Sequence, residues 1–272
     1  MTLERIVVGA DESEASRQGI RTALAWAGRL GASVTLYHVA ARQPAVVLTG
    51  WPRHGPAAPE ALGAWVETEL AGRPDQAMPT LAMGHGLPGV EIPRFAETAD
   101  ADLLVIGRKP RSAMLRLFEG DTADAVARRS TVPCLFVRQP LLVPTRMLVA
   151  LDGTERGMRV LGPALAIASG LESRVSGVTV ERAHPGEPAA LADTVRTART
   201  ANLERRLNGS VESLVVRRGE PALEIMHAAD AVGADLIVIG YRRGGPPGVI
   251  EGGSVARRVA HEAPCAVLTV PL

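Results

Sequence analysis

An internal repeat constrains the fold of this chain more than any other feature of its sequence. Residues 5–11 (RIVVGAD) recur at 146–152 (RMLVALD), and residues 101–107 (ADLLVIG) recur at 234–240 (ADLIVIG). The first pair is 141 residues apart and the second pair 133, so the second copy is eight residues shorter. Repetition on this scale indicates one structural module that has been duplicated.

The chain of 272 residues is long enough for two ordinary domains, which we expect at residues 1–140 and 144–272. The linker at 138–144 is short and contains proline, so the domains should be closely associated. Each module ends in an apolar strand, at 135–137 and 266–270, and such edges usually need cover. We therefore expect the modules to pack together as an intramolecular pseudo-dimer.

Short apolar runs alternate with segments of helical periodicity along each module. In the first module the predicted strands are 5–10, 34–39, 81–83, 103–106 and 134–137, and the predicted helices are 13–30, 61–70, 90–99 and 122–129. A long loop is expected at 42–60, and the second module repeats the same order. Strands that alternate with helices predict an α/β fold whose open parallel sheet is covered on both faces.

Composition excludes several classes of partner. The formal net charge is +1, so the chain has no overall positive field, and nucleic acid is not an expected partner. No apolar run approaches the roughly 18 residues of a membrane span, and the first residues do not resemble a secretion signal. We expect a soluble, cytoplasmic protein.

In an open parallel sheet, ligands bind beyond the carboxyl ends of the strands, where the strand order reverses. In the second module this point is marked by Asp152, by Val180 and by the glycine-rich loop 240–254 before the predicted helix 255–262. Glycines expose backbone N–H groups, and a helix N-terminus attracts anions, so the loop favours phosphate. The alternative is that Ser254 only caps the helix and the glycines only form a turn.

At these residues the chain resembles the universal stress protein family. The shared motifs are Asp-Gly-Thr at 152–154, Gly-x-Pro at 219–221 and Ala-Asp-Leu-Ile-Val-Ile-Gly at 234–240. The resemblance covers nearly all of both modules. It implies two tandem Rossmann-like domains of the adenine nucleotide alpha hydrolase-like type.

The resemblance also implies a site for ATP, with Mg²⁺, in the second module. ATP-binding members carry glycine, two residues, glycine, nine residues, then glycine and serine or threonine. Here Gly240, Gly253 and Ser254 match, whereas Arg243 replaces the middle glycine. By resemblance Asp152 and Val180 would contact adenine and ribose, and the sugar and phosphates would be surrounded by Gly240, Gly253, Ser254 and Val255. Arg242 or Arg243 could add charge to a phosphate or point into solvent.

The first module departs further from this pattern. Its equivalents are Asp11, Val39, Gly107 and Gly120, but Pro110 stands at the middle glycine and Asp121 follows Gly120. A carboxylate about 4 Å from a phosphate charge would cost on the order of 4 kcal/mol at an effective dielectric of 20. We expect a degenerate nucleotide site there.

The sequence assigns no catalytic residue and no metal site. It has neither a P-loop nor a dinucleotide-binding motif, and its histidines lack paired ligand spacing. Asp102 and Asp235 open the fourth strand of each module, where we expect them to bind loop amides. We expect Cys134 and Cys265 to be buried free thiols.

These features predict a stress-adaptation or signalling protein whose second domain binds ATP as a regulatory ligand. One alternative is a slow ATPase or autokinase. Another is a nucleotide-free scaffold that acts through an unknown protein partner. Whether the whole chain also forms a homodimer stays open.

Overall fold

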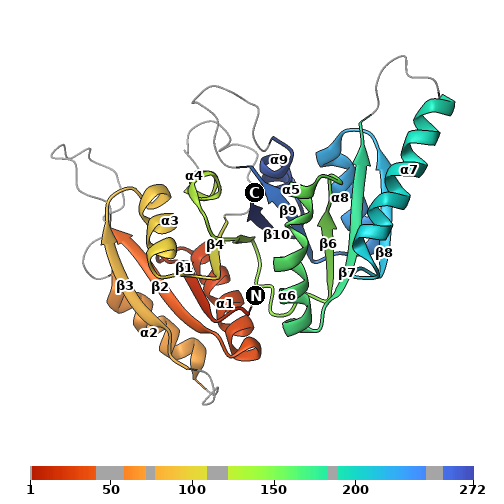
Figure 1. Ribbon diagram of the computed structural model, residues 1–272. Helices are drawn as coiled ribbons and strands as arrows, with labels where there is room; N and C mark the ends of the chain where they lie inside the picture. Colours follow the sequence, from red (N-terminus) through yellow and green to blue (C-terminus); the bar gives the residue numbers. More distant parts are fainter. Residues whose placement is uncertain (1, 41–57, 72–76, 109–121, 183–188, 243–253) are drawn as a thin grey trace. The chain divides into compact units, whose positions relative to one another are not determined.

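The computed structural model describes residues 2–40, 58–71, 77–108, 122–182, 189–242 and 254–272. The chain divides into two compact units, Thr2–Leu142 and Val143–Leu272, which we call domain 1 and domain 2. Each is an α/β domain built on parallel strands, so the predicted fold class is confirmed (Figure 1). The pairing of the two domains stays a prediction.

Domain 1 has the strand order β3-β2-β1-β4-β5, with parallel neighbours throughout. The strands are β1 (Arg5–Gly9), β2 (Ser33–Ala40), β3 (Thr80–His85), β4 (Leu103–Gly107) and β5 (Cys134–Val137). The helices are α1 (Glu14–Leu30), α2 (Ala58–Leu70), α3 (Pro88–Thr98) and α4 (Thr122–Arg129). The predicted order is therefore correct, with element ends shifted by a few residues. The predicted loop at 42–60 lies mostly outside the described residues.

Domain 2 repeats this arrangement with the strand order β10-β9-β6-β7-β8. The strands are β6 (Arg146–Ala150), β7 (Arg174–Glu181), β8 (Ser213–Arg218), β9 (Leu236–Tyr241) and β10 (Ala266–Pro271). The helices are α5 (Glu155–Met158), α6 (Leu161–Leu171), α7 (Ala189–Leu207), α8 (Pro221–Val232) and α9 (Ser254–Glu262). Among the described helices of both domains, none is long and apolar enough to cross a membrane.

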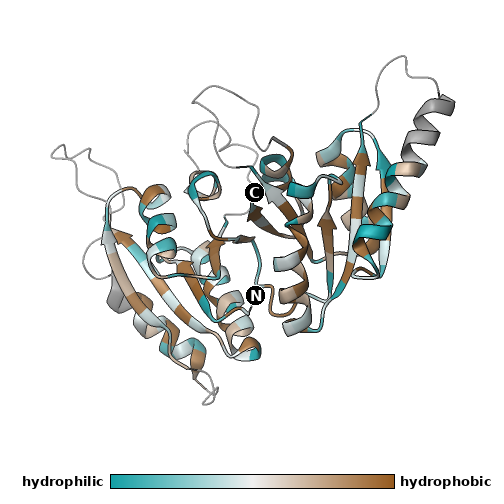
Figure 2. Cartoon of the chain, viewed as in Figure 1, coloured by the Kyte–Doolittle hydropathy of each residue, from teal (hydrophilic) through white to brown (hydrophobic). Residues whose placement is uncertain are grey.

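Each sheet forms the centre of a hydrophobic core. Figure 2 shows that the strands are the most hydrophobic parts of both domains, whereas the helices carry polar residues on their outer faces. Leu103, Leu104 and Val105 of β4 have no exposed surface, and neither do Leu236, Ile237 and Val238 of β9. Strands buried on both faces are typical of parallel sheets between helical layers.

One helix of the repeat differs between the domains. Where domain 1 has the continuous helix α1, domain 2 has α5 and α6, separated by Arg159 and Val160. Pro163 stands at the repeat position of Thr22, and it lacks the N–H group that would bond to the carbonyl of Arg159. The expectation that domain 2 copies domain 1 in this helix is therefore wrong.

Two aspartates tie the beginning of each first strand to the fourth strand. Asp102 Oδ2 accepts the backbone N–H groups of Glu4 and Arg5, at 2.8 and 2.9 Å. Asp235 accepts the backbone N–H and the hydroxyl of Thr145, both at 2.8 Å. The structural role predicted for both aspartates is confirmed.

The linker is anchored at the end of domain 1. The indole Nε1–H of buried Trp26 donates to the carbonyl of Leu141 at 2.9 Å, and the N–H of Leu141 donates to Thr22 Oγ1 at 3.0 Å. Both backbone groups of Leu141 are thus held by α1. Because Thr145 is bonded to Asp235 within domain 2, only residues 142–144 lie between the two anchors.

Candidate functional site

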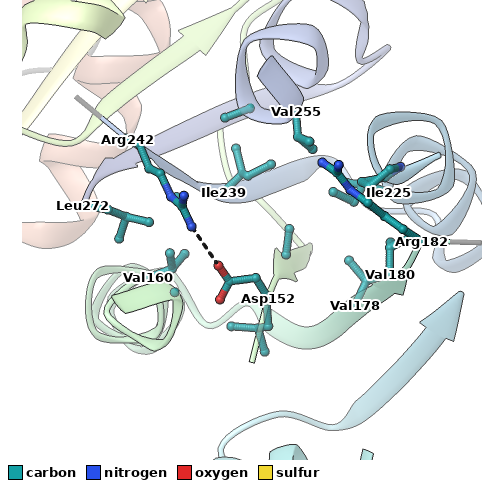
Figure 3. A pocket seen from close by; sticks show the side chains of 16 residues that line it. Asp152, Val160, Val178, Val180, Arg182, Ile225, Ile239, Arg242, Val255 and Leu272 are labelled. Atoms are coloured by element: carbon teal, nitrogen blue, oxygen red, sulfur yellow. Dashed lines mark ion pairs between the residues drawn. The ribbon is translucent and has the colours of Figure 1, made fainter. Parts of the chain in front are cut away.

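A pocket of about 330 Å³ opens at the carboxyl ends of β6, β7 and β9 in domain 2. Strand order reverses between β6 and β9, which is where ligands bind in this class of sheet. Its volume lies at the lower end of the ~300–1,000 Å³ of small-molecule sites. Sixteen residues line it: Ala150, Leu151, Asp152, Gly157, Val160, Val178, Val180, Arg182, Pro221, Ile225, Ile239, Gly240, Arg242, Val255, Ala256 and Leu272 (Figure 3).

The walls of the pocket are mostly aliphatic. Alternate residues of β7 point to the same face of the sheet, so Val178 and Val180 both reach the pocket. Ile225 of α8 and Ile239 of β9 complete this apolar lining. Flat apolar walls of this kind suit a planar heterocycle or another hydrophobic group.

Among the described residues that line the pocket, Asp152 is the one carboxylate, and its side chain is 46% exposed. Its Oδ1 accepts the backbone N–H of Thr154 at 2.9 Å and the Thr154 hydroxyl at 2.7 Å. Thr154 Oγ1 accepts the N–H of Gly157 at 2.9 Å and so caps α5. Asp152 Oδ2 lies 3.9 Å from Arg242 Nη2. The carboxylate is therefore held from one side and faces a cation on the other.

Two glycines make room for this arrangement. A Cβ at Gly157 would lie 1.9 Å from Asp152 Oδ1, so a side chain there would displace the carboxylate. A Cβ at Gly240 would lie 2.4 Å from Leu272 Cδ1 and 3.1 Å from Val160 Cγ2. At both positions a larger residue would have to displace a neighbouring side chain, Asp152 at Gly157 and Leu272 at Gly240.

Most of the predicted site residues lie around this one pocket. Asp152, Val180, Gly240 and Val255 all line it. Arg243 and Gly253 lie outside the described residues. Ser254 is the first residue of α9, and the described part of the chain does not include its side chain.

Arg182 is a pocket residue that the sequence analysis missed. It follows Val180 by two positions, so the strand alternation that places Val180 in the pocket also places Arg182 there. This signal was present in the sequence. Gly157 and Val160 were missed as well, because their effect depends on how α5 and α6 approach β9.

The equivalent positions of domain 1 are packed differently. Gly107 is covered by the first turn of α1, since a Cβ there would lie 1.7 Å from the carbonyl oxygen of Ala15. Gly19 allows this approach, because its own Cβ position is 3.1 Å from the N atom of Gly107. In domain 2 the repeat partner of Gly19 is Val160, and its Cγ2 lies 3.1 Å from the Cβ position of Gly240.

In domain 1, an aromatic side chain replaces an aliphatic one at a position equivalent to the wall of the domain 2 pocket. Tyr37, the repeat partner of Val178, stacks on Phe95 with ring centroids 4.0 Å apart and planes 3° from parallel. Burial raises the pKa of the Tyr37 hydroxyl, and the nearby Glu91 carboxylate adds to the rise. The ring extends over Gly84, whose Cβ position lies 1.9 Å from Tyr37 Oη.

The remaining predicted residues of domain 1 have structural contacts. Asp11 Oδ1 accepts the N–H of Ser13 at 2.9 Å, and the N–H of Asp11 donates to Ser16 Oγ at 2.9 Å. Val39 is buried in β2. Gly120 lies outside the described residues.

The two cysteines differ in burial. Cys134 is fully buried, and burial raises the pKa of its thiol to about 12. Cys265 is only partly buried, so the prediction of two buried thiols is wrong for this residue. Its strand begins one residue later, at Ala266. Neither thiol forms a disulfide.

Comparison with known proteins identifies the class of protein to which this fold and pocket belong. The model of the universal stress protein family matches the chain twice, at residues 2–138 and 144–271. The chain therefore belongs to the universal stress protein family, as a tandem member with two family domains.

Individual relatives agree with this assignment. A universal stress protein of Thermus aquaticus is 34% identical over 132 residues, which are 46% of this chain and 96% of the relative. The crystal structure of a universal stress protein from Archaeoglobus fulgidus covers 100% of this chain with a TM-score of 0.70 and 19% identity, over 99% of its own length. A functionally unknown protein from Pseudomonas aeruginosa covers 99% of this chain with a TM-score of 0.72 and 16% identity, over 92% of its length. At these low sequence identities, the two comparisons show that this chain has the same fold as the two structures.

Proposed function

We propose that domain 2 binds an adenine nucleotide, ATP carrying Mg²⁺ on its phosphates, as a regulatory ligand in stress adaptation. The observation that carries the proposal is that Asp152, Val180, Gly240 and Val255 all line one pocket. The family resemblance independently assigns these residues to nucleotide binding. Family membership supports the role in stress.

The chemistry of the lining suits the parts of such a ligand. Val178, Val180 and Ile225 offer aliphatic surface for the faces of the base. Asp152 Oδ2 can accept a hydrogen bond from a ribose hydroxyl or an exocyclic amine, because its Oδ1 already has two donors. The first turn of α9 provides backbone N–H groups and a positive helix end for phosphate.

A bound nucleotide would act by shifting a conformational equilibrium. ATP can regulate the protein only if one conformation binds it more tightly than another.

Calorimetric titration of the nucleotide-free protein with Mg-ATP tests the proposal. We expect one site per chain. Replacing Val180 with tryptophan should abolish binding, because the indole would occupy the pocket. Val216→Trp on β8 makes the same change at a residue that does not line the pocket, and it should retain binding.

Thermal unfolding of each variant establishes that it is folded. Two sites per chain would mean that domain 1 also binds nucleotide. If Mg-ATP gives neither a heat of binding nor thermal stabilisation of the unmodified protein, the proposal is refuted.

A further inference from the structure

The feature that goes beyond nucleotide binding itself is Arg182. It lies one residue beyond the end of β7, where it continues the alternation of Val178 and Val180, and it lines the pocket from this position. Figure 3 shows its guanidinium group extending along the pocket toward Val255 at the start of α9. A cation thus stands beside the helix end that favours anions.

The two arginines of the pocket differ in their partners. Arg242 lies 3.9 Å from Asp152, which partly balances its charge. Within the described residues no carboxylate lies within ion-pair distance of Arg182. The described lining therefore has two guanidinium groups and one carboxylate, and the excess positive charge lies on the side of Arg182.

We propose that Arg182 is a specificity-determining residue that binds the phosphate groups of the nucleotide and makes the pocket select nucleotides over nucleosides. This inference rests on the proposed function. The planar guanidinium group donates two parallel hydrogen bonds to phosphate oxygens, and such charge-assisted pairs are strong.

In this arrangement the aliphatic residues contact the base and Arg182 contacts the phosphate groups. Aliphatic contacts with Val178, Val180 and Ile225 contribute equally to adenosine and ATP, because both ligands carry the same base. Arg182 contributes only when a phosphate is present. Affinity should therefore increase from adenosine through AMP and ADP to ATP, and the increase should shrink at high salt.

The test is a series of titrations with adenosine, AMP, ADP and ATP at constant ionic strength. Arg182→Gln should weaken binding of the three nucleotides roughly ten- to a hundredfold, the expected effect of losing a hydrogen bond to a charged group. Binding of adenosine should change by less than about twofold. Arg182→Lys keeps the positive charge but lacks the two parallel N–H donors of the guanidinium group. It should therefore retain only part of the nucleotide affinity of the unmodified protein.

Arg174→Gln is the matched control. Arg174 begins the same strand at its opposite end, and its side chain is 70% exposed and 3.8 Å from Glu212. The control removes a charge of the same sign at a residue that does not line the pocket. It should leave the affinities for adenosine, AMP, ADP and ATP unchanged.

The outcomes separate this inference from the proposed function. If the unmodified protein binds adenosine as tightly as ATP, or if Arg182→Gln weakens both ligands equally, nucleotide binding stands and the role of Arg182 is refuted. If the unmodified protein binds none of the four ligands, both proposals fail.

Discussion

The Asp152 carboxylate can take its position because Gly157 has no Cβ atom. Gly157 follows the Thr154 cap by one helical turn, and its lack of a Cβ leaves space for Asp152 Oδ1. The repeat partner of Gly157 in domain 1 is Ser16, whose hydroxyl bonds to the backbone of Asp11 instead. One small residue thus decides where the preceding carboxylate points.

We predict that Gly157→Ala weakens nucleotide binding by domain 2 about tenfold. The new methyl group would displace the Asp152 carboxylate, whose side chain is partly exposed, so the core is not disturbed and the fold should be retained. Titration with ATP measures the loss, and thermal unfolding measures the stability.

The matched control is Gly162→Ala in α6, where an added Cβ meets nothing within 4 Å. This change should leave ATP affinity unchanged, because the added methyl group lies away from the side chain of Asp152. Equal ATP affinity in both variants would show that the carboxylate position does not matter for binding.

From the sequence, a residue could be assigned to the pocket only where it belongs to a family motif. Asp152, Gly240 and Val255 could be identified because the family resemblance includes them, and all three line the pocket. Leu272 belongs to no motif. It reaches the pocket because β10 lies beside β9 and no side chain fills Gly240, which is a tertiary contact that local sequence patterns do not contain.

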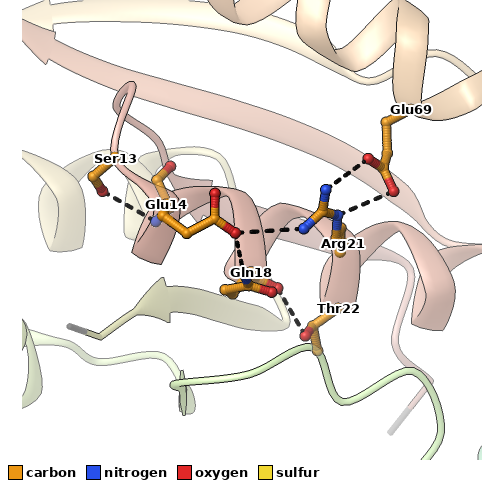
Figure 4. Close-up of polar contacts among 7 residues, drawn as sticks. Ser13, Glu14, Gln18, Arg21, Thr22 and Glu69 are labelled. Atoms are coloured by element: carbon orange, nitrogen blue, oxygen red, sulfur yellow. Dashed lines mark hydrogen bonds and ion pairs between the residues drawn. The ribbon is translucent and has the colours of Figure 1, made fainter. Parts of the chain in front are cut away.

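At the scale of elements, helix α2 is held to α1 by an arginine that makes several contacts at once. Arg21 donates from Nε and Nη2 to the two carboxylate oxygens of Glu69, both at 3.1 Å (Figure 4). The same guanidinium lies 5.4 Å from the ring centre of Trp65, and a further nitrogen lies 3.5 Å from Glu14. The Glu69 hydrogen bond raises the pKa of the Arg21 guanidinium, which strengthens the hold of the charged group on the carboxylate.

We predict that Arg21→Ala lowers the free energy of unfolding of domain 1 by about 1 kcal/mol, since it removes a bidentate ion pair and a cation–π contact that are partly exposed. Urea unfolding followed by tryptophan fluorescence measures the change.

Arg128→Ala provides the comparison. It removes an ion pair with Asp124 within the single helix α4, and such pairs contribute no more than ~0.5 kcal/mol. If the two variants lose the same stability, the contact between α1 and α2 adds nothing beyond a surface ion pair.

The order of the elements could be read from the sequence because each strand is a short apolar run bounded by polar residues. The break between α5 and α6 could have been predicted from Gly162-Pro163, which the comparison of repeats obscured. The close approach of α1 to β4 could not, because it results from two glycines, Gly19 and Gly107, that are distant in sequence.

At the scale of the whole molecule, the linker is anchored rather than free. Leu141 is bonded to α1 of domain 1 through both of its backbone groups, and Thr145 is bonded to Asp235 of domain 2. A chain segment bonded in this way resists the local unfolding that a protease requires.

We predict that Trp26→Phe makes the linker more sensitive to chymotrypsin at Leu141 and Leu142 under native conditions. The substitution removes the donor to the Leu141 carbonyl and leaves space in the core, at a cost of about 2 kcal/mol. Mass spectrometry of the early fragments identifies the cleavage site.

Trp65→Phe is the control, because Trp65 lies on α2 and stacks with Arg17 and Arg21 rather than with the linker. Cleavage at the linker should not increase in this variant. The same early fragments from both variants would mean that the Trp26 hydrogen bond does not protect the linker.

The placement of both copies on one chain also determines how the protein can evolve. In an assembly of identical chains, every mutation enters all binding sites together, so an aromatic ring at the wall of one pocket appears in all of them. Here Tyr37 and Val178 occupy equivalent positions but are encoded separately, as are Gly19 and Val160. Selection can therefore act on one copy for packing and on the other for a ligand, without compromise between them.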